Sequence, residues 1–142
     1  MKLTVVAVGK IRERDLRGIA DDYVARIRRY VRLDEVEVPR DAALGRSLPK
    51  GATIVALDPD GDALTSKGFA RKVEAWGRRG KGDVAFVIGG AEGIPTELVR
   101  SADARLSLST LTLPHRLARV LLFEQIYRAF TILRGEPYAR EN

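Results

Sequence analysis

The chain has 142 residues, of which 45% are hydrophobic, so it is long enough to bury a core and too apolar to be disordered. No apolar run approaches the length of a membrane span, and the absence of cysteine excludes disulfides, thiolate catalysis and cysteine metal sites. The net charge of +6, carried mostly by arginine, favours a polyanionic partner such as nucleic acid, although many small domains are basic for solubility alone. We expect the cytoplasm as its compartment.

Strands and helices are predicted to alternate along a single domain, residues 1–142. We expect five strands, at 3–8, 36–38, 53–57, 83–88 and 104–108. Between and after them we expect helices at 15–32, at 41–48, from a cap at Thr65 or Ser66 to Arg79, at 95–100 as a single turn, and at 115–134. A turn is expected at 58–61. This order is typical of an α/β fold in which a mostly parallel sheet has helices on both faces.

The two long helices differ in how their apolar residues are spaced. The first carries one apolar stripe, made of Ile19, Tyr23, Ile27 and Tyr30. The last carries two stripes, made of Leu122, Ile126, Ala129 and Leu133 and of Val120, Phe123, Tyr127 and Phe130. Because two stripes cover roughly half of a helix circumference, we expect the second one to pack against another copy of the chain, which predicts a homodimer. The alternative is a helix that is wholly internal to one chain.

Glycines follow the predicted strand at 83–88 directly. Gly89, Gly90 and Gly93 permit positive φ angles and let the backbone approach a ligand closely. Their spacing matches neither the dinucleotide-binding fingerprint nor a Walker A loop. A purely structural turn is the alternative interpretation of this segment.

A second candidate loop combines hydroxyl groups with leucines. It consists of Leu108, Ser109, Thr110, Leu111, Thr112 and Leu113. Such a loop can offer backbone amides and carbonyls to an adenine edge while leucines enclose the ring. The alternative is an ordinary strand end, with Thr112 capping a helix whose first turn holds Pro114.

The remaining candidates lie at the start of the last helix and in the tail after it. His115, the only histidine, is a capping or packing residue or a substrate contact. Arg134, Tyr138 and Arg140 combine cations with an aromatic ring, which is typical of a grip on single-stranded RNA, although a solvated charged surface is the alternative. No Ser-His-Asp triad can be assembled and no acidic cluster has metal-ligand spacing, so we expect the ligand itself to carry the chemistry and no metal to take part.

Five segments in order carry a resemblance to a known family. They are 2–10 (KLTVVAVGK), 86–93 (FVIGGAEG), 106–115 (LSLSTLTLPH), 119–129 (RVLLFEQIYRA) and 133–138 (LRGEPY). Together they resemble the RlmH (YbeA-like) family of SPOUT-class RNA methyltransferases, and the resemblance covers essentially the whole chain. It implies S-adenosylmethionine-dependent methylation of N3 of a pseudouridine, at position 1915 in the family, in large-subunit (23S) ribosomal RNA or the assembled ribosome.

The resemblance also implies a fold and a set of site residues. The C-terminal segment would thread through a loop to form a trefoil knot, and the chain would dimerise through its last helix. S-adenosylmethionine would be bound by Leu57, Gly89 and the loop 108–113. Tyr138, Arg140 and His115 would be the catalytic candidates, and Arg134, Tyr138 and Arg140 would hold the RNA.

The sequence departs from the family pattern in two places. Segment 39–51 is short where relatives carry a longer helix, which would trim a peripheral or RNA-facing surface and leave the pocket intact. Ala139 stands where relatives have a histidine, so a histidine-dependent proton role cannot be transferred to it. Two other functions stay open: a non-catalytic RNA- or ribosome-binding module, and a nucleotide-binding enzyme of another class that uses Gly89 and Gly90 for phosphate.

Overall fold

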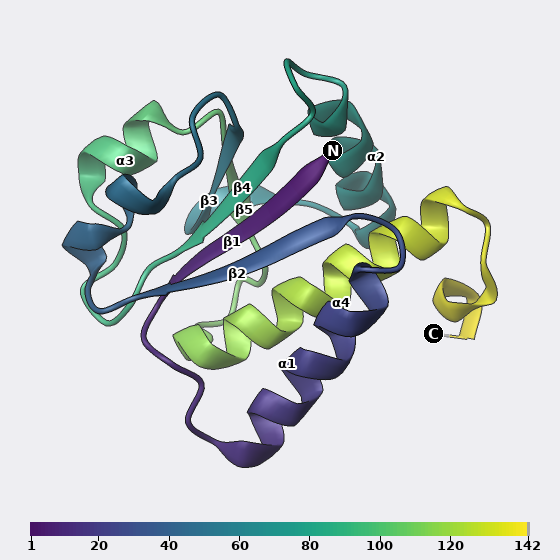
Figure 1. Ribbon diagram of the computed structural model, residues 1–142, viewed down its shortest axis with the longest axis horizontal. Coiled ribbons are helices and arrows are strands. Elements are labelled where there is room, and N and C mark those ends of the chain that lie inside the picture. The colour runs from purple at the N-terminus through teal and green to yellow at the C-terminus, as the bar shows by residue number, and fades with distance from the viewer. Residues whose placement is uncertain (142) are drawn as a thin grey trace.

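A five-stranded parallel sheet forms the centre of the molecule in a computed structural model that describes residues 1–141 (Figure 1). The strands are β1 (Lys2–Val8), β2 (Arg32–Val38), β3 (Thr53–Ala63), β4 (Val84–Ile88) and β5 (Ala104–Ser107). The helices are α1 (Arg14–Ile27), α2 (Ser66–Gly77), α3 (Thr96–Ser101) and α4 (His115–Leu133), with short 3-10 turns η1 (Asp41–Ala43), η2 (Gly45–Ser47) and η3 (Pro137–Glu141). The strand order is β2-β1-β4-β3-β5, and every neighbouring pair is parallel.

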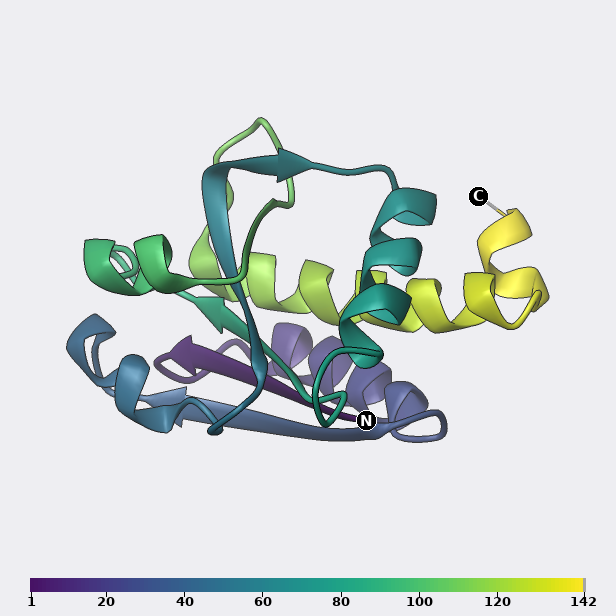
Figure 2. The same ribbon diagram turned by 90° about the horizontal axis from the view of Figure 1, so that it is seen from above.

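Both faces of the sheet are covered, as the alternating pattern predicted (Figure 2). Because side chains of a strand alternate between faces, Val5 contributes to one core and Val6 to the other. The larger core lies under α1, α2 and α4, and the smaller one lies under the 3-10 turns and α3. The predicted α/β fold with helices on both faces is therefore confirmed, whereas the threading of the C-terminal segment into a knot stays a prediction.

Helix α4 is buried mainly by its own chain. Residues from both predicted stripes, including Leu122, Phe123 and Ile126, are fully buried, because α4 packs against α1 and α2. Only Leu121 and Leu133 remain as large exposed apolar side chains on this helix within the described residues, each 36% exposed. Much of the apolar surface that suggested a homodimer is thus already covered, and the homodimer stays a prediction.

The first helix differs from its prediction in both length and facing. It ends at Ile27 instead of Arg32, and Arg32 already begins β2, which starts four residues before the strand expected at 36–38. Its buried residues are Ala20, Val24 and Ile27, while Ile19 is 47% exposed. The predicted stripe was wrong at Ile19, because the helix turns the face of Ala20, Val24 and Ile27 toward the core and leaves Ile19 outside it.

Two connections also differ from expectation. Segment 41–48 forms the two 3-10 turns in place of one short helix. The turn predicted at 58–61 is a bend inside β3, where Leu57 and Asp62 both pair with Leu106 (Figure 2). The Asp60 N–H donates to Asp58 Oδ1 at 3.0 Å, which is the local turn chemistry that the sequence indicated.

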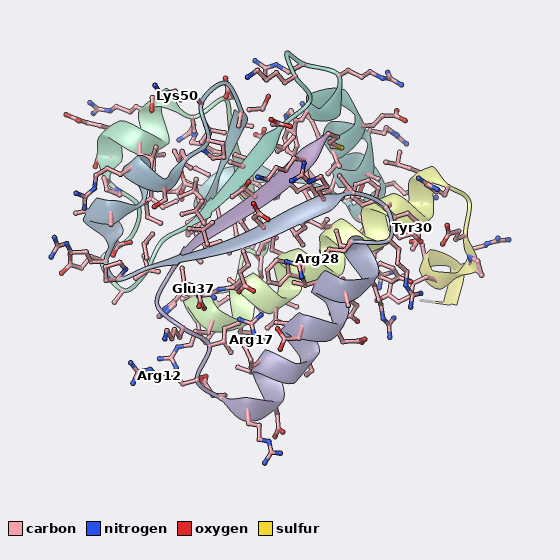
Figure 3. The ribbon with its side chains drawn as sticks, viewed as in Figure 1. Arg12, Arg17, Arg28, Tyr30, Glu37 and Lys50 are labelled. Carbon is pink, nitrogen blue, oxygen red and sulfur yellow. The ribbon has the colours of Figure 1, made fainter. Side chains whose placement is uncertain are left out.

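A buried ionic cluster connects α1, β2 and α4. Arg119 of α4 is fully buried and donates to Glu35 at 2.9 Å and to Glu37 at 2.6 Å. Arg17 of α1 donates to the other Glu35 oxygen at 2.6 Å and lies beside Glu37 (Figure 3). Arg119 also donates to the carbonyl of Gly9 at 2.8 Å, so the cluster fixes the end of β1 as well.

Acid is expected to weaken this cluster. Burial raises the pKa of Glu35, but hydrogen bonds from Arg17 and Arg119 outweigh it, so the pKa lies below the ordinary 4.5. A carboxylate whose pKa is lower in the folded state stabilises the fold at pH values above its unfolded-state pKa. This contribution to the free energy of unfolding is lost as the pH falls through the folded-state pKa. Urea unfolding from about pH 7 to about pH 3 should show this loss below about pH 4.5.

The matched variants for the acid prediction are Glu35→Gln and Glu74→Gln. The first should reduce the acid-dependent loss of stability because residue 35 no longer titrates. The second removes an exposed carboxylate paired with Arg78 on α2 and should leave the loss as in the parent chain. Identical acid profiles for Glu35→Gln and the parent chain would contradict the assignment.

Candidate functional site

An open cleft lies at the carboxyl edge of the sheet, where β3 bends after Leu57, β4 ends and α4 begins. Its volume is about 640 Å³, within the range of small-molecule sites. It is lined by residues 57–59, residues 88–94, Val99 and residues 112–115. Loops that follow parallel strands converge at the carboxyl edge of the sheet, which is where α/β folds bind ligands. This cleft is therefore the candidate ligand site.

The cleft brings together several residues that the sequence singled out in separate segments. Leu57, Gly89, Thr112 and Leu113, all predicted to bind the cofactor, line its wall. His115, the first residue of α4, lines the same cleft. It follows Pro114 at the N-terminus of α4, so Thr112 is not the helix cap that the alternative interpretation required.

The other half of the predicted loop lies outside this wall. Leu108 lines a separate hollow of about 200 Å³ between α2 and α4. The Ser109 carbonyl accepts from Ser107, and its hydroxyl accepts from the Leu111 N–H, so these residues form a turn of their own. Thr110 is exposed, and Leu111 is 76% exposed. A cofactor role for Leu108, Ser109, Thr110 and Leu111 stays a prediction.

Sequence reasoning missed some of the lining. Asp58, Pro59, Ile94 and Val99 line the cleft. Asp58 and Pro59 were expected only as turn residues and Val99 only as a helix residue, while Ile94 was assigned to no element. Asp58 and Pro59 could have been found, because they directly follow the predicted site residue Leu57 at the carboxyl end of a strand. Val99 gave no such signal, since only the folding of α3 over the sheet brings it there.

In the loop after β4, Gly89 and Gly90 are required because there is no room for a Cβ atom, and not because of a positive φ angle. Neither Gly89 nor Gly90 has a positive φ, which corrects the expectation, whereas Gly93 has φ +83°. A Cβ on Gly89 would lie 2.7 Å from the Ile94 nitrogen, and one on Gly90 would lie 2.9 Å from a Val8 methyl group. The loop 89–94, called the glycine loop below, is thus folded tightly on itself and against β1.

The tail residues occupy a different part of the molecule. The Tyr138 hydroxyl donates to Glu124 at 2.7 Å and lies 3.1 Å from the Tyr23 hydroxyl, and its ring packs edge-on against Tyr127 at 4.7 Å. Arg128 lies over the Tyr138 ring and forms an ion pair with Glu124 at 2.7 Å. Tyr138 is therefore a half-buried anchor of the tail.

The two other tail candidates are more exposed. Arg134 lies 5.1 Å from the centre of the Tyr30 ring, and Arg140 donates to the Gly135 carbonyl at 3.0 Å. Together with Lys67 and Arg128, Arg140 lines a basic hollow of about 760 Å³ at the start of α2. The geometry agrees with a surface that can face an anion.

Burial and hydrogen bonding keep Tyr138 and Tyr30, which contacts the tail through Glu136, protonated. Burial raises the pKa of Tyr138, and its bonds to Tyr23 and Glu124 raise it further. The pKa of Tyr30 is raised to about 12 by burial and by its hydrogen bond to Glu136. A phenol with a raised pKa is a poor proton acceptor near neutral pH.

Within one chain the tail and the cleft are far apart. His115 lies in the cleft at the start of α4, while Arg128, which contacts Tyr138, lies 13 residues further along the helix, a rise of about 20 Å. Figure 1 shows the tail at the opposite end of α4 from His115. The structure thus brings Leu57, Gly89, Thr112 and Leu113 of the predicted cofactor residues into one cleft but does not bring the predicted RNA residues to them.

The amino-acid sequence is similar to those of known proteins along nearly its whole length. The sequence pattern of the family described as "Predicted SPOUT methyltransferase" matches residues 1–139. A protein of Sorangium cellulosum named ribosomal RNA large subunit methyltransferase H is 53% identical, covering 98% of this chain and 99% of its own length. A protein of the same name from Anaeromyxobacter dehalogenans is 47% identical over 97% of this chain and 99% of its own.

The chain belongs to the SPOUT methyltransferases, in the ribosomal RNA large subunit methyltransferase H family. This confirms the family that the sequence resembled. Membership makes methyl transfer the class of chemistry and S-adenosylmethionine the methyl donor, as predicted.

Solved structures support the SPOUT fold. A probable methylase family protein from Haemophilus influenzae superimposes with a TM-score of 0.60 at 14% identity, covering 96% of this chain and 69% of that one. A tRNA (m1G37) methyltransferase from Aquifex aeolicus gives a TM-score of 0.54 at 11% identity, covering 90% and 70%. At these identities the likeness concerns the fold alone.

None of the helices within residues 1–141 has the length and hydropathy of a membrane span. The same residues contain no group of three or more histidine, aspartate or glutamate side chains placed to hold a metal ion.

Proposed function

We propose that this SPOUT methyltransferase transfers a methyl group from S-adenosylmethionine to N3 of a pseudouridine in large-subunit (23S) ribosomal RNA, at the position numbered 1915 in the family. The observation that carries the proposal is a cleft between the bend of β3, the end of β4 and the start of α4, in a chain similar over nearly its full length to relatives named ribosomal RNA large subunit methyltransferase H. We further propose that the chain acts as one domain in the cytoplasm.

The residues of the cleft fit a cationic nucleoside donor. Leu57, Ile88 and Leu113 give the wall an apolar part for an adenine ring, and Gly89, Gly90 and Gly93 line it without side chains. Asp58 and Glu92 add negative charge to the lining, which suits a sulfonium cation. When bound, S-adenosylmethionine supplies an electrophilic methyl group. The chain has to orient the attacking nitrogen toward this methyl group and exclude water.

The tail is the proposed RNA contact. Arg134 and Arg140 are exposed cations, and we assign them to RNA phosphates or bases. The raised pKa of Tyr138 favours a role in holding the tail over accepting the N3 proton. His115 and Arg140 are the other predicted catalytic candidates, and of these His115 lines the cleft.

A homodimer would bring these parts together. Because the tail lies about 20 Å from the cleft along α4, a tail can act on a bound donor only if a second copy presents it. The exposed Leu121 and Leu133 supply apolar contacts for such a copy. We therefore propose that each active site combines the cleft of one subunit with the tail of the other.

Incubation of the purified protein with isotopically labelled S-adenosylmethionine and either naked 23S RNA or assembled ribosomes tests the proposed function. We expect one methyl group per ribosome, located at N3 of a pseudouridine by nuclease digestion and mass spectrometry. Calorimetric titration with S-adenosylhomocysteine and with ATP separates the alternatives. RNA binding without S-adenosylhomocysteine binding would indicate a non-catalytic module, and tight ATP binding alone would indicate another nucleotide-binding enzyme.

A further inference from the structure

One buried carboxylate outside the predicted site contacts the cleft wall from behind. Asp41, in η1, is 9% exposed, and its Oδ1 accepts the N–H of Gly90 at 2.7 Å. Gly90 belongs to the glycine loop and lines the cleft. A carboxylate in this position satisfies a backbone donor that would otherwise be left without a partner.

The contact belongs to a set that leaves the glycine loop little freedom. The Gly93 N–H donates to the Gly90 carbonyl at 3.0 Å, which closes the loop on itself. A Cβ on Gly90 would lie 2.9 Å from Val8 and 3.3 Å from the second Asp41 oxygen. Gly90 is therefore held between the end of β1 and the side chain of Asp41.

The burial of Asp41 agrees with a positioning role. Its η1 turn packs Ala43 and Leu44 into the smaller core, so the side chain is presented from a fixed backbone. A hydrogen bond to a charged acceptor is roughly twice as strong as one between neutral groups, which makes the Asp41 carboxylate an effective clamp on the amide. Segment 39–51, expected to be peripheral, thus supports the wall of the cleft.

We propose that Asp41 is a positioning residue for the methyl donor. By holding the Gly90 amide it keeps the glycine loop in the conformation that the donor needs, without touching the donor itself. This inference rests on the proposed function, because it concerns the same cleft. It predicts that loss of the carboxylate weakens donor binding more than it weakens the fold or the contact with RNA.

The test compares Asp41→Ala and Asp41→Asn with Asp103→Ala. Asp103 also accepts a backbone N–H, that of Ile54 at 2.8 Å, but at the amino edge of the sheet, away from the cleft. Affinity for S-adenosylhomocysteine is measured by calorimetry, and KM for S-adenosylmethionine, KM for RNA and kcat are measured in the methylation assay. Thermal unfolding reports the stability of each variant.

We expect Asp41→Ala to raise the donor Kd and KM about tenfold, and Asp41→Asn, which keeps a neutral acceptor, to raise them about threefold. The KM for RNA and kcat should change less than about twofold, and Asp103→Ala should bind the donor like the parent chain. Parent-like donor affinity in Asp41→Asn, or in a folded Asp41→Ala, would overturn the proposal, as would an equal loss in Asp103→Ala. If Asp41→Ala does not fold, Asp41→Asn decides. Failure of the parent chain to bind the donor would instead refute the proposed function.

Discussion

Replacement of Gly89 by alanine is expected to weaken binding of S-adenosylhomocysteine by about 100-fold while the chain remains folded. The added Cβ would lie 2.7 Å from the Ile94 nitrogen and 2.9 Å from the Gly93 carbonyl carbon. Both are backbone atoms, so no side-chain rotation can relieve the clash, and the backbone of the glycine loop must move. The sheet should survive, because β4 ends at Ile88 and the displaced loop lies at its edge. Calorimetry and circular dichroism give the two readouts.

Gly18→Ala is the matched control for this prediction. Gly18 lies in α1, and a Cβ there would meet no atom within 4 Å. The control should bind the donor like the parent chain and be slightly more stable, since alanine favours a helix. Wild-type affinity in Gly89→Ala would show that the loop accommodates a side chain, and the assignment of the donor to this cleft would then fail.

Replacement of Arg119 by methionine is expected to lower the free energy of unfolding by about 3–5 kcal/mol. The fully buried guanidinium holds Glu35, Glu37 and the carbonyls of Val8 and Gly9. Methionine fills a similar volume but leaves two half-buried carboxylates without this cation. Removing one partner of a buried ion pair costs more than the pair contributes as a whole, because the remaining charges are then only partly compensated, here by Arg17. Urea unfolding at neutral pH measures the change.

Two comparisons make the Arg119 result interpretable. Arg71→Met, on the exposed face of α2, should change stability by less than about 0.5 kcal/mol. Addition of Glu35→Gln and Glu37→Gln to Arg119→Met should recover part of the loss, since the uncompensated charges disappear. If Arg119→Met were as stable as Arg71→Met, the cluster would not be a determinant of stability.

The sequence predicted the larger elements well because their signals are local. The apolar run at 3–8 and the run at 83–88 read as buried strands, and both lie side by side at the centre of the sheet. Thr65 caps α2 by accepting the Gly68 N–H at 3.0 Å, as expected from its side chain. Gly135, with φ +67°, follows the end of α4, where a glycine is favoured.

The candidate site was predicted in part. Leu57, Gly89, Thr112 and Leu113 could be named because each lies at or near the end of a predicted strand or before a helix, where ligands bind in α/β folds. Their convergence was inferred mainly from the family resemblance, because strand order cannot be read from periodicity. Asp58 and Asp41 were not recognised, since a carboxylate in a turn has the same local signature whether it is exposed or buried.

By itself, the amino-acid sequence determined which segments are strands and helices, that they alternate, and which family the chain belongs to, because propensity, capping and ordered motifs are properties of neighbouring residues. The tertiary structure alone decided that Arg119 is buried between two glutamates, that α4 is mostly covered by its own chain, that Asp41 supports Gly90, and that the tail lies far from the cleft. These facts depend on contacts between residues distant in the sequence, and such contacts are set by how the helices pack on the sheet.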